Sequence, residues 1–575
     1  MASTSRPDMG GDRLLIPGDT CRRTARADRF AYIVDGADYF RHCKAAMLRA
    51  QHRIILIGWD FNMRMTFERG GKTLPGPNQL GAFLRRLVRL RPTLEIYLLR
   101  SNLRLLPAFE GIWGDYTPVS LLNWLGGERL HFAIDGAHPT GAVHHQKIVV
   151  IDDAVAFCGG IDLTLERWDT SEHLDYSRFR RAAGDTYGPR HEVGAVMDAA
   201  AAEALSEVAR DRWHSATGLT LAPLDVGQAI WPSGLEPALR NVDVAVARTL
   251  PELGDRTGVR EVETLNLAAI AAARRTIYLE NQYLASRRLA DALAERLQES
   301  DGPEIVIVMP RNSESRLEEQ SMDSARYRIL QVLWAADSHQ RFAVYWPVTD
   351  ADSPIYVHSK VMVIDDRLLR IGSSNLNNRS MGFDSECDVA VEAEPDSSEH
   401  ADIREMIMSV RNQLVCEHLG VAPDDFGSAV EQHGSFLRAV EALRGDGRTL
   451  RRFTQDTVAD EASLLAENDL MDPDHVPRSL AKSVQRWLEG FTKGPPSSQP
   501  AQSLRQAIRW RYALPDRVRD PPIGERTMSR EPTSDGKQTE EPKGGRPGPA
   551  DHGREGGIAT RENAPELTDP DHVSD

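Results

Sequence analysis

The chain has 575 residues, which is longer than most chains that fold around a single hydrophobic core, so two or more domains are expected. Its hydrophobic content of 41% is adequate for globular folding. The formal net charge of −16 argues against a protein that holds nucleic acid by bulk electrostatics, although a local basic cleft stays compatible with it. The five cysteines are scattered and odd in number, which argues against a disulfide framework.

Two parts of the chain show the same order of predicted elements. In each, a helix leads into an apolar strand and a second apolar strand follows. The predicted ranges are helix 37–51 with strands 54–57 and 94–99 in the first part, and helix 262–275 with strands 277–283 and 305–309 in the second. Uninterrupted Val/Ile runs favour strands covered on both faces, and therefore α/β layers. The shared order indicates two copies of one unit.

The composition changes between and around these copies. An Ala-rich stretch, 195–212, predicts a helix, and beyond residue 494 Pro, Gly, Ser and charged residues dominate, which is typical of disorder. The predicted boundaries are a flexible leader (1–25), an N-terminal lobe (26–218), a linker (219–236), a C-terminal lobe (237–425), a helical extension (426–493) and a disordered tail (494–575).

A polar signature follows the second strand of each copy. The first signature is His145-Gln146-Lys147, four apolar residues, Asp152, six residues, then Gly159-Gly160-Ile161-Asp162. The second is His358-Ser359-Lys360, four apolar residues, Asp365, six residues, then Gly372-Ser373-Ser374-Asn375. The spacing within the two signatures is identical, so chance is an implausible origin. Each signature is interpreted as half of a duplicated active site.

The spacing of each His and Lys places both side chains on the same face of a strand. The glycines that follow permit the backbone to approach a ligand closely. If the two copies pack face to face, their signatures form one pocket with two imidazoles and two ammonium groups. Such a pocket suits a phosphodiester, because the lysines offset the charge of the anion and of its transition state.

The two histidines can divide the chemistry of a phosphodiester between them. A neutral imidazole attacks phosphorus in line, and a protonated one donates to the departing oxygen. The expected intermediate is a phosphohistidine, which water or another alcohol resolves. Opposite protonation states of the two imidazoles predict a bell-shaped pH profile that belongs to the pair. No cofactor or metal is required, and Lys at the centre of both signatures argues against metal ligation there.

These signatures resemble those of the phospholipase D superfamily, the HKD phosphodiesterases, and the resemblance covers roughly Cys21 to Pro477. Further similar segments are Gly58-Trp59-Asp60-Phe61, Pro189-Arg190-His191-Glu192-Val193, Ile277 to Tyr283, Asn375 to Met381 and Met471-Asp472-Pro473. The chain resembles the two-copy phospholipases more than the short single-copy nucleases. The resemblance implies an α/β fold of two similar lobes with the active site at their interface, plus a helical C-terminal region and a disordered tail.

The resemblance also implies roles for individual residues. The candidate catalytic set is His145, Lys147, Asp152, His358, Lys360 and Asp365. Within it, His145 would be the nucleophile and His358 the general acid, the two lysines would bind phosphate, and the two aspartates would brace the structure rather than touch substrate.

Four further positions are carried over in the same way. Asn375 would bind substrate, and Asp162 stands at the matching position, where many members have Asn. Glu192 and Glu386 resemble the acids that orient the two histidines.

Three functions are compatible with these residues. The leading hypothesis is hydrolysis of the head-group phosphodiester of glycerophospholipids to phosphatidic acid, with head-group exchange as a variant. The second is a nuclease or other phosphodiesterase, which the acidic charge disfavours. The third is a non-catalytic scaffold, which the intact His and Lys of both signatures disfavour.

The expected partner is a phospholipid membrane surface, without nucleic acid or an obligate protein partner, and the expected state is a monomer. Since the sequence shows neither the apolar run of a membrane helix nor a secretory signal, the expected location is cytoplasmic or peripheral to a membrane. Export by a route that reads no such signal is left open.

Overall fold

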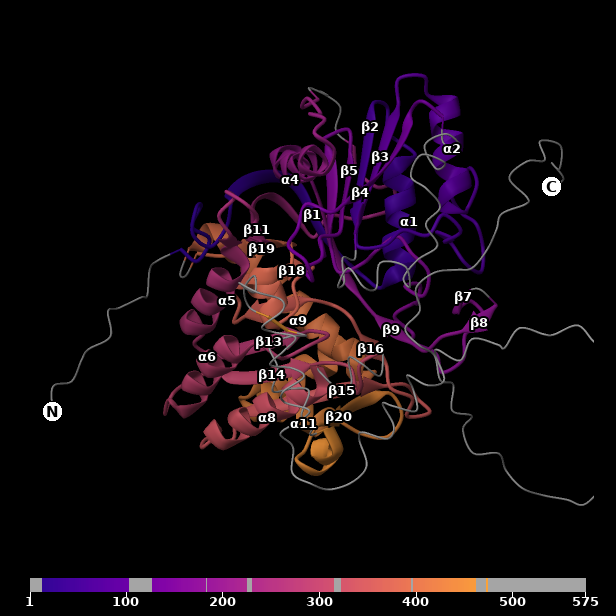
Figure 1. The fold of residues 1–575 in the computed structure, drawn as a ribbon. Helices are drawn as coiled ribbons and strands as arrows, with labels where there is room; N and C mark the ends of the chain where they lie inside the picture. The colour runs from indigo at the N-terminus through magenta and orange to yellow at the C-terminus, as the bar shows by residue number, and fades with distance from the viewer. Residues whose placement is uncertain are drawn as a thin grey trace, which may run out of the picture. The chain divides into compact units, whose positions relative to one another are not determined.

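The computed structural model describes residues 13–102, 127–182, 184–224, 230–314, 322–394, 397–461 and 472–473. The predicted tail, part of the predicted leader and most of the predicted extension beyond residue 461 lie outside these described residues. The described part is built on one mixed sheet of 16 strands with helices on both faces (Figure 1).

The first half of the chain contributes seven strands to this sheet. They are β1 (Arg23–Val34), β2 (Arg53–Gly58), β3 (Glu95–Ser101), β4 (Leu130–Asp135), β5 (Ile148–Ile151), β6 (Val155–Gly159) and β10 (Val193–Asp198). From the centre of the sheet outward their order is β1-β10-β6-β5-β2-β3-β4. The first signature therefore lies on β5 and β6, between strands that pack on both sides.

The second half repeats this arrangement. Its strands are β11 (Leu239–Leu250), β13 (Thr276–Glu280), β14 (Glu304–Val308), β15 (Phe342–Val348), β17 (Val361–Ile364), β18 (Leu368–Gly372) and β19 (Glu386–Glu392). From the centre outward they run β11-β19-β18-β17-β13-β14-β15, which is the order of the first half strand for strand. The predicted α/β fold of two similar lobes is confirmed.

The two long strands β1 and β11 join the halves into one sheet. They pair antiparallel, with Arg23 opposite Val246 at one end and Phe30 opposite Leu239 at the other. Contacts also run between the half-sheets away from this seam, from β6 and β10 to β18 and β19. Because β6 and β18 belong to the two signatures, these contacts draw the signatures together.

Helices cover both faces of each half-sheet. They are α1 (Gly36–Met47), α2 (Leu80–Leu90) and α4 (Ala199–Thr217) in the first half, and α5 (Glu261–Ala272), α6 (Arg287–Gln298), α8 (Ser324–Ala336), α9 (Ala401–Leu419), α10 (Pro423–His433) and α11 (Phe436–Leu443) in the second. Alternate residues of β2 show the layering: Ile54 and Leu56 belong to the core under α1 and α2, whereas Ile55 and Ile57 belong to the core that contains α4.

The remaining elements are short. They are β7 (Arg181–Ala182), β8 (Asp185–Thr186), β9 (Arg190–His191), β12 (Val259–Arg260), β16 (Tyr356–Val357), β20 (Thr449–Arg452), a π-helical turn over Arg379–Phe383, and 3-10 turns over Ser398–His400 and Asp456–Glu461. No helix within the described ranges has both the length and the apolar character that crossing a bilayer requires.

The observed elements differ from the predicted ones in three places. The predicted helix 195–212 begins as strand β10, and α4 starts only at Ala199, where φ is +54°. The predicted strand 277–283 ends at Glu280. The region predicted as a helical extension also holds a strand, β20, which pairs antiparallel with β15 at the sheet edge. Its sequence, Thr-Leu-Arg-Arg, is too short and too charged to reveal a strand by pattern.

Candidate active site

The first signature begins just before β5, at the end of the strand that faces the second half of the chain. The His145 N–H donates to the Ser385 carbonyl at 2.9 Å, and His145 Nδ1 lies 3.1 and 3.2 Å from the two carboxylate oxygens of Glu386. Lys147 Nζ donates to the His145 carbonyl at 2.9 Å and lies 3.3 Å from Asp162 Oδ2. Residues of the second half therefore fix the first imidazole.

The second signature repeats this geometry with the halves exchanged. The His358 N–H donates to the His191 carbonyl at 2.9 Å. His358 Nδ1 lies 2.9 Å from Glu192 Oε1, an ion-pair distance whose alignment does not meet that of a hydrogen bond. Lys360 Nζ donates to the His358 carbonyl at 2.6 Å and to Gln282 Oε1 at 3.1 Å. Each histidine thus faces a glutamate from the other half of the chain.

Gly160 shows how closely the halves approach. A Cβ atom at this position would lie 3.2 Å from Glu192 Oε2, 3.2 Å from the His358 carbonyl oxygen and 3.3 Å from Lys360 Cδ. Since these separations are tighter than ordinary van der Waals contact, the second signature packs against the backbone of the first. The two signatures form one site.

The charges of the site act across the two halves. Burial lowers the pKa of His145 well below its usual range, and Lys147 and Lys360 lower it further. Burial likewise lowers the pKa of His358, with Lys360 and Lys147 among the cations that add to it. Both imidazoles are therefore neutral near pH 7 in the ligand-free protein.

The pKa values of the glutamates and of Lys360, which surround the two histidines, are shifted as well. Burial raises the pKa of Glu386 to about 8, and it also raises that of Glu192. Burial lowers the pKa of Lys360 to about 7, because the cation is held away from water and near Lys147. Burial therefore favours the neutral form of both members of each His–Glu pair in the ligand-free protein.

The two signature aspartates lie at the opposite end of their strands. Asp152 accepts backbone N–H groups from Gln51, His52 and Arg53 at 2.6 to 2.7 Å. Asp365 accepts those of Arg274, Arg275 and Thr276 at 2.7 to 2.9 Å. Both have positive φ, at +52° and +53°, which Asp tolerates better than most residues. The structure does not bring these two candidate residues to the site; they fix the start of β2 and β13.

The matching positions Asp162 and Asn375 have different surroundings. Asp162 accepts the Trp59 N–H at 2.9 Å and pairs with Lys147, so its negative charge faces a cation. Asn375 is 5% exposed, and its Oδ1 atom has no hydrogen-bond partner among the described residues. A buried amide without a partner is costly unless a ligand completes it.

Several residues of the site were not among the predicted site residues. Arg167 lies near enough to lower the pKa of His358, and its buried Nε atom has no partner among the described residues. Ser373 and Ser380 donate to the two oxygens of Glu386 at 2.5 and 2.6 Å. Gln282 lies two residues beyond the end of β13, within the similar segment from Ile277 to Tyr283. Only Ser373 lies inside a signature, so spacing alone could not reveal the others.

Known proteins match the chain over most of its described part. A family model described as "Cardiolipin synthase, PLD-like domain" matches residues 267–407. Phospholipase D alpha 1 of Carica papaya is 23% identical over 66% of the chain and 64% of its own length. Phospholipase D alpha 4 of Arabidopsis thaliana is 23% identical over 72% and 68%, and phospholipase D A of Dictyostelium discoideum 23% identical over 68% and 35%. The chain therefore spans about two thirds or less of the length of these relatives.

Two solved structures are also similar. A phosphatidylserine synthase of Haemophilus influenzae has 13% identity and a TM-score of 0.47, over 73% of this chain and 95% of its own. The phospholipase D family member Nuc of Salmonella typhimurium has 18% identity and a TM-score of 0.21, over 30% and 91%. The family model, the curated relatives and the two complete signatures together support the phospholipase D superfamily as the family of this chain.

Proposed function

We propose that the chain is a phospholipase D-type phosphodiesterase that hydrolyses the head-group phosphodiester of glycerophospholipids. The observation that carries the proposal is the crossed pair of His–Glu contacts, His145 with Glu386 and His358 with Glu192, beside two signature lysines in one site. The names of the curated relatives support a lipid substrate, and the net charge of −16 disfavours a polyanion held along the surface.

The geometry supports a role in the reaction for one nitrogen of each imidazole. Since Nδ1 of His145 faces Glu386, Nε2 is left to attack phosphorus, and the bond from phosphorus to the head-group oxygen breaks. Nε2 of His358 gives its proton to that oxygen, which leaves as the free alcohol. Lys147, Lys360 and the NH₂ group of Asn375 bind the phosphate oxygens, and the charge of the two lysines offsets that of the transition state.

The second step reverses the roles of the histidines. His358, now neutral, takes a proton from water as the water oxygen attacks phosphorus, and the bond from phosphorus to His145 breaks. The products are phosphatidic acid and the free head group. An alcohol that replaces water gives head-group exchange through the same intermediate. We further propose that the protein meets its substrate as a monomer at the membrane surface.

The test uses purified protein with mixed-phospholipid vesicles and a few per cent ethanol, followed by mass spectrometry of the lipids. The proposal expects phosphatidic acid together with phosphatidylethanol, and neither from the His145→Ala protein. The consumed lipid identifies the head group. If no lipid is consumed while single-stranded DNA or bis(p-nitrophenyl) phosphate is cleaved, the site acts on a different diester and the lipid assignment is wrong.

A further inference from the structure

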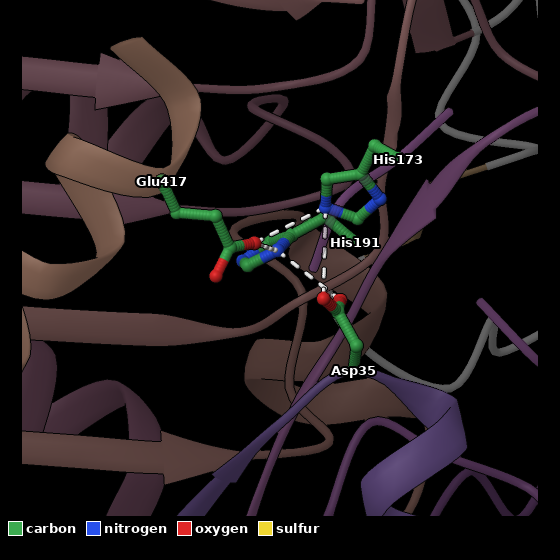
Figure 2. A group of neighbouring side chains, drawn as sticks. All are labelled: Asp35, His173, His191 and Glu417. Carbon is green, nitrogen blue, oxygen red and sulfur yellow. Dashed lines mark hydrogen bonds and ion pairs between the residues drawn. The ribbon is translucent and has the colours of Figure 1, made fainter. Parts of the chain in front are cut away.

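Behind the second signature lies a buried group of four side chains that the mechanism does not use. It comprises Asp35, which precedes α1, His173 from the loop after β6, His191 of β9 and Glu417 of α9 (Figure 2). Their side chains are 1%, 0%, 0% and 8% exposed. We call this group the His173 cluster. Three of its members come from the first half of the chain and Glu417 comes from the second.

The four side chains point at one another around a common centre (Figure 2). Glu417 Oε1 lies 2.9 Å from His191 Nδ1 and 3.1 Å from His173 Nε2. Asp35 Oδ1 lies 3.3 Å from His191 Nδ1, and its Oδ2 lies 3.6 Å from His173 Nε2. A tetrahedral zinc ion with bonds of about 2.0 to 2.2 Å separates its ligand atoms by roughly 3.3 to 3.6 Å. The two separations from Asp35, one from each of its oxygens, lie in that range, and the two from Glu417 are slightly shorter.

The other nitrogen of each imidazole already has a carboxylate partner. His173 Nδ1 lies 3.1 Å from Asp169 Oδ2, and His191 Nε2 lies 3.0 Å from Glu280 Oε2. Metal-binding histidines characteristically have this second contact, because it fixes the tautomer and the ring orientation.

The two outer carboxylates are themselves held. Arg180 Nη1 donates to both oxygens of Asp169 at 3.2 and 3.3 Å. Tyr278 and Ser359 donate their hydroxyls to Glu280 at 2.6 and 2.7 Å. The inner and outer contacts of a metal centre are therefore both present in the ligand-free geometry.

We propose that the His173 cluster binds a divalent transition metal of the zinc class, with two imidazole nitrogens and two carboxylate oxygens as ligands. Two imidazoles favour zinc over calcium or magnesium, which prefer oxygen ligands throughout. One divalent cation also balances the two inner carboxylates, as a buried site requires.

The alternative to a bound metal is protonation of both imidazoles of the His173 cluster. Burial opposes such protonation, but Asp35, Asp169 and Glu417 outweigh it and raise the pKa of His173 to about 9. Two protons would give the cluster the same net charge as one divalent cation, so charge balance alone does not decide between them. A direct measurement of bound metal does.

The site would act on catalysis only through position. The Asp35 N–H donates to the Glu192 carbonyl at 2.7 Å, and Asp35 Oδ1 accepts the Glu192 N–H at 3.1 Å. The His191 carbonyl in turn accepts the His358 N–H at 2.9 Å. A metal held by Asp35 and His191 would therefore fix the backbone on which Glu192 and His358 sit, without touching substrate.

The experiment measures metal in the full-length protein. Protein expressed with added zinc, then dialysed, is expected to retain about one zinc ion per chain by inductively coupled plasma mass spectrometry. Removal of the metal by a chelator should lower Tm, and cobalt(II) put in its place should show the intense visible bands of tetrahedral coordination. Wild-type protein that retains no zinc after dialysis, and shows no such cobalt spectrum, overturns the proposal.

Variants place the metal in the cluster. His173→Gln and Glu417→Gln should lose the zinc, whereas His138→Gln should keep it, because His138 is also buried but its ring nitrogens bond to the carbonyls of Pro139 and Asn102 and to no carboxylate of the cluster. Asp169→Asn, which keeps all four ligands, should weaken zinc affinity by roughly 10- to 100-fold. Zinc retained equally by folded His173→Gln and Glu417→Gln proteins would contradict the site. None of these readouts depends on the lipid activity proposed above.

Discussion

The signature aspartates offer a test that separates bracing from catalysis. Asp152 is 1% exposed, and Oδ1 accepts two of its three backbone N–H groups while Oδ2 accepts the third. In Asp152→Asn the amide oxygen can keep two of these bonds without their charge, but the NH₂ group meets the Gln51 N–H as a second donor. Asn also tolerates the positive φ at this position, so the substitution adds little backbone strain.

The expected cost follows from these contacts. A hydrogen bond to a charged group contributes about 1.5 to 3 kcal/mol, against about 0.5 to 1.5 kcal/mol for a neutral one. Losing one bond, at about 2 kcal/mol, and neutralising two others, at about 1.3 kcal/mol each, should therefore destabilise the protein by roughly 5 kcal/mol. At this chain size that corresponds to a fall in Tm of roughly 5 °C or more. Because Asp152 lies at the far end of β5 from His145, kcat/KM should stay within about threefold of the wild-type value.

The assay pairs differential scanning calorimetry with the vesicle assay at a temperature where the variant is folded. Asp365→Asn is the matched variant in the other half and should behave in the same way. His145→Gln is the opposite control, with little change in Tm and no turnover. An Asp152→Asn protein that melts like the wild type but loses activity by 100-fold would refute the bracing role.

Three further predictions concern the site itself. His145→Ala and His358→Ala should each abolish turnover with unchanged circular dichroism, and substantial activity in either would contradict the two-histidine mechanism. Burial lowers the pKa of Lys360 to about 7, so this cation is present below that pH and lost above it; kcat/KM should fall as pH rises through about 7, and the fall should vanish in Lys360→Arg if that protein keeps measurable activity. Glu386→Gln cannot stabilise a charged His145 imidazole, so kcat should drop roughly 100-fold at unchanged KM, and kinetics like the wild type would rule out this role.

The duplication could be predicted from the sequence because the residues of each signature lie close together along the chain. The spacing from His145 to Asp162, repeated from His358 to Asn375, lies within two adjacent strands, and the strands 148–151 and 361–364 are where the apolar runs predict them. The long strands β1 and β11 escaped prediction. Strand β1 begins with Arg-Thr-Ala-Arg-Ala-Asp-Arg, which lacks the apolar run typical of a buried strand. Several of these side chains face solvent, while the backbone pairs with β11 and so joins the two halves.

The His173 cluster could not be predicted from local sequence patterns. In the sequence His191 appeared only as part of the similar segment from Pro189 to Val193. Its partners Asp35, Glu280 and Glu417 are 156, 89 and 226 positions away and share no spacing rule. They meet because β9 pairs with β16 and α9 packs beneath the sheet, which is long-range topology that local patterns do not encode.

The central claim is a covalent phosphohistidine at one of two signature histidines, and trapping it is the most direct test. In His358→Asn the base for the second step is missing, so an adduct formed slowly with a phosphatidyl p-nitrophenyl ester, whose leaving group needs no general acid, should accumulate. Peptide mass spectrometry after a rapid quench is expected to find the phosphatidyl group on His145. Steady hydrolysis with no adduct on His145, or an adduct on another residue, would contradict the mechanism.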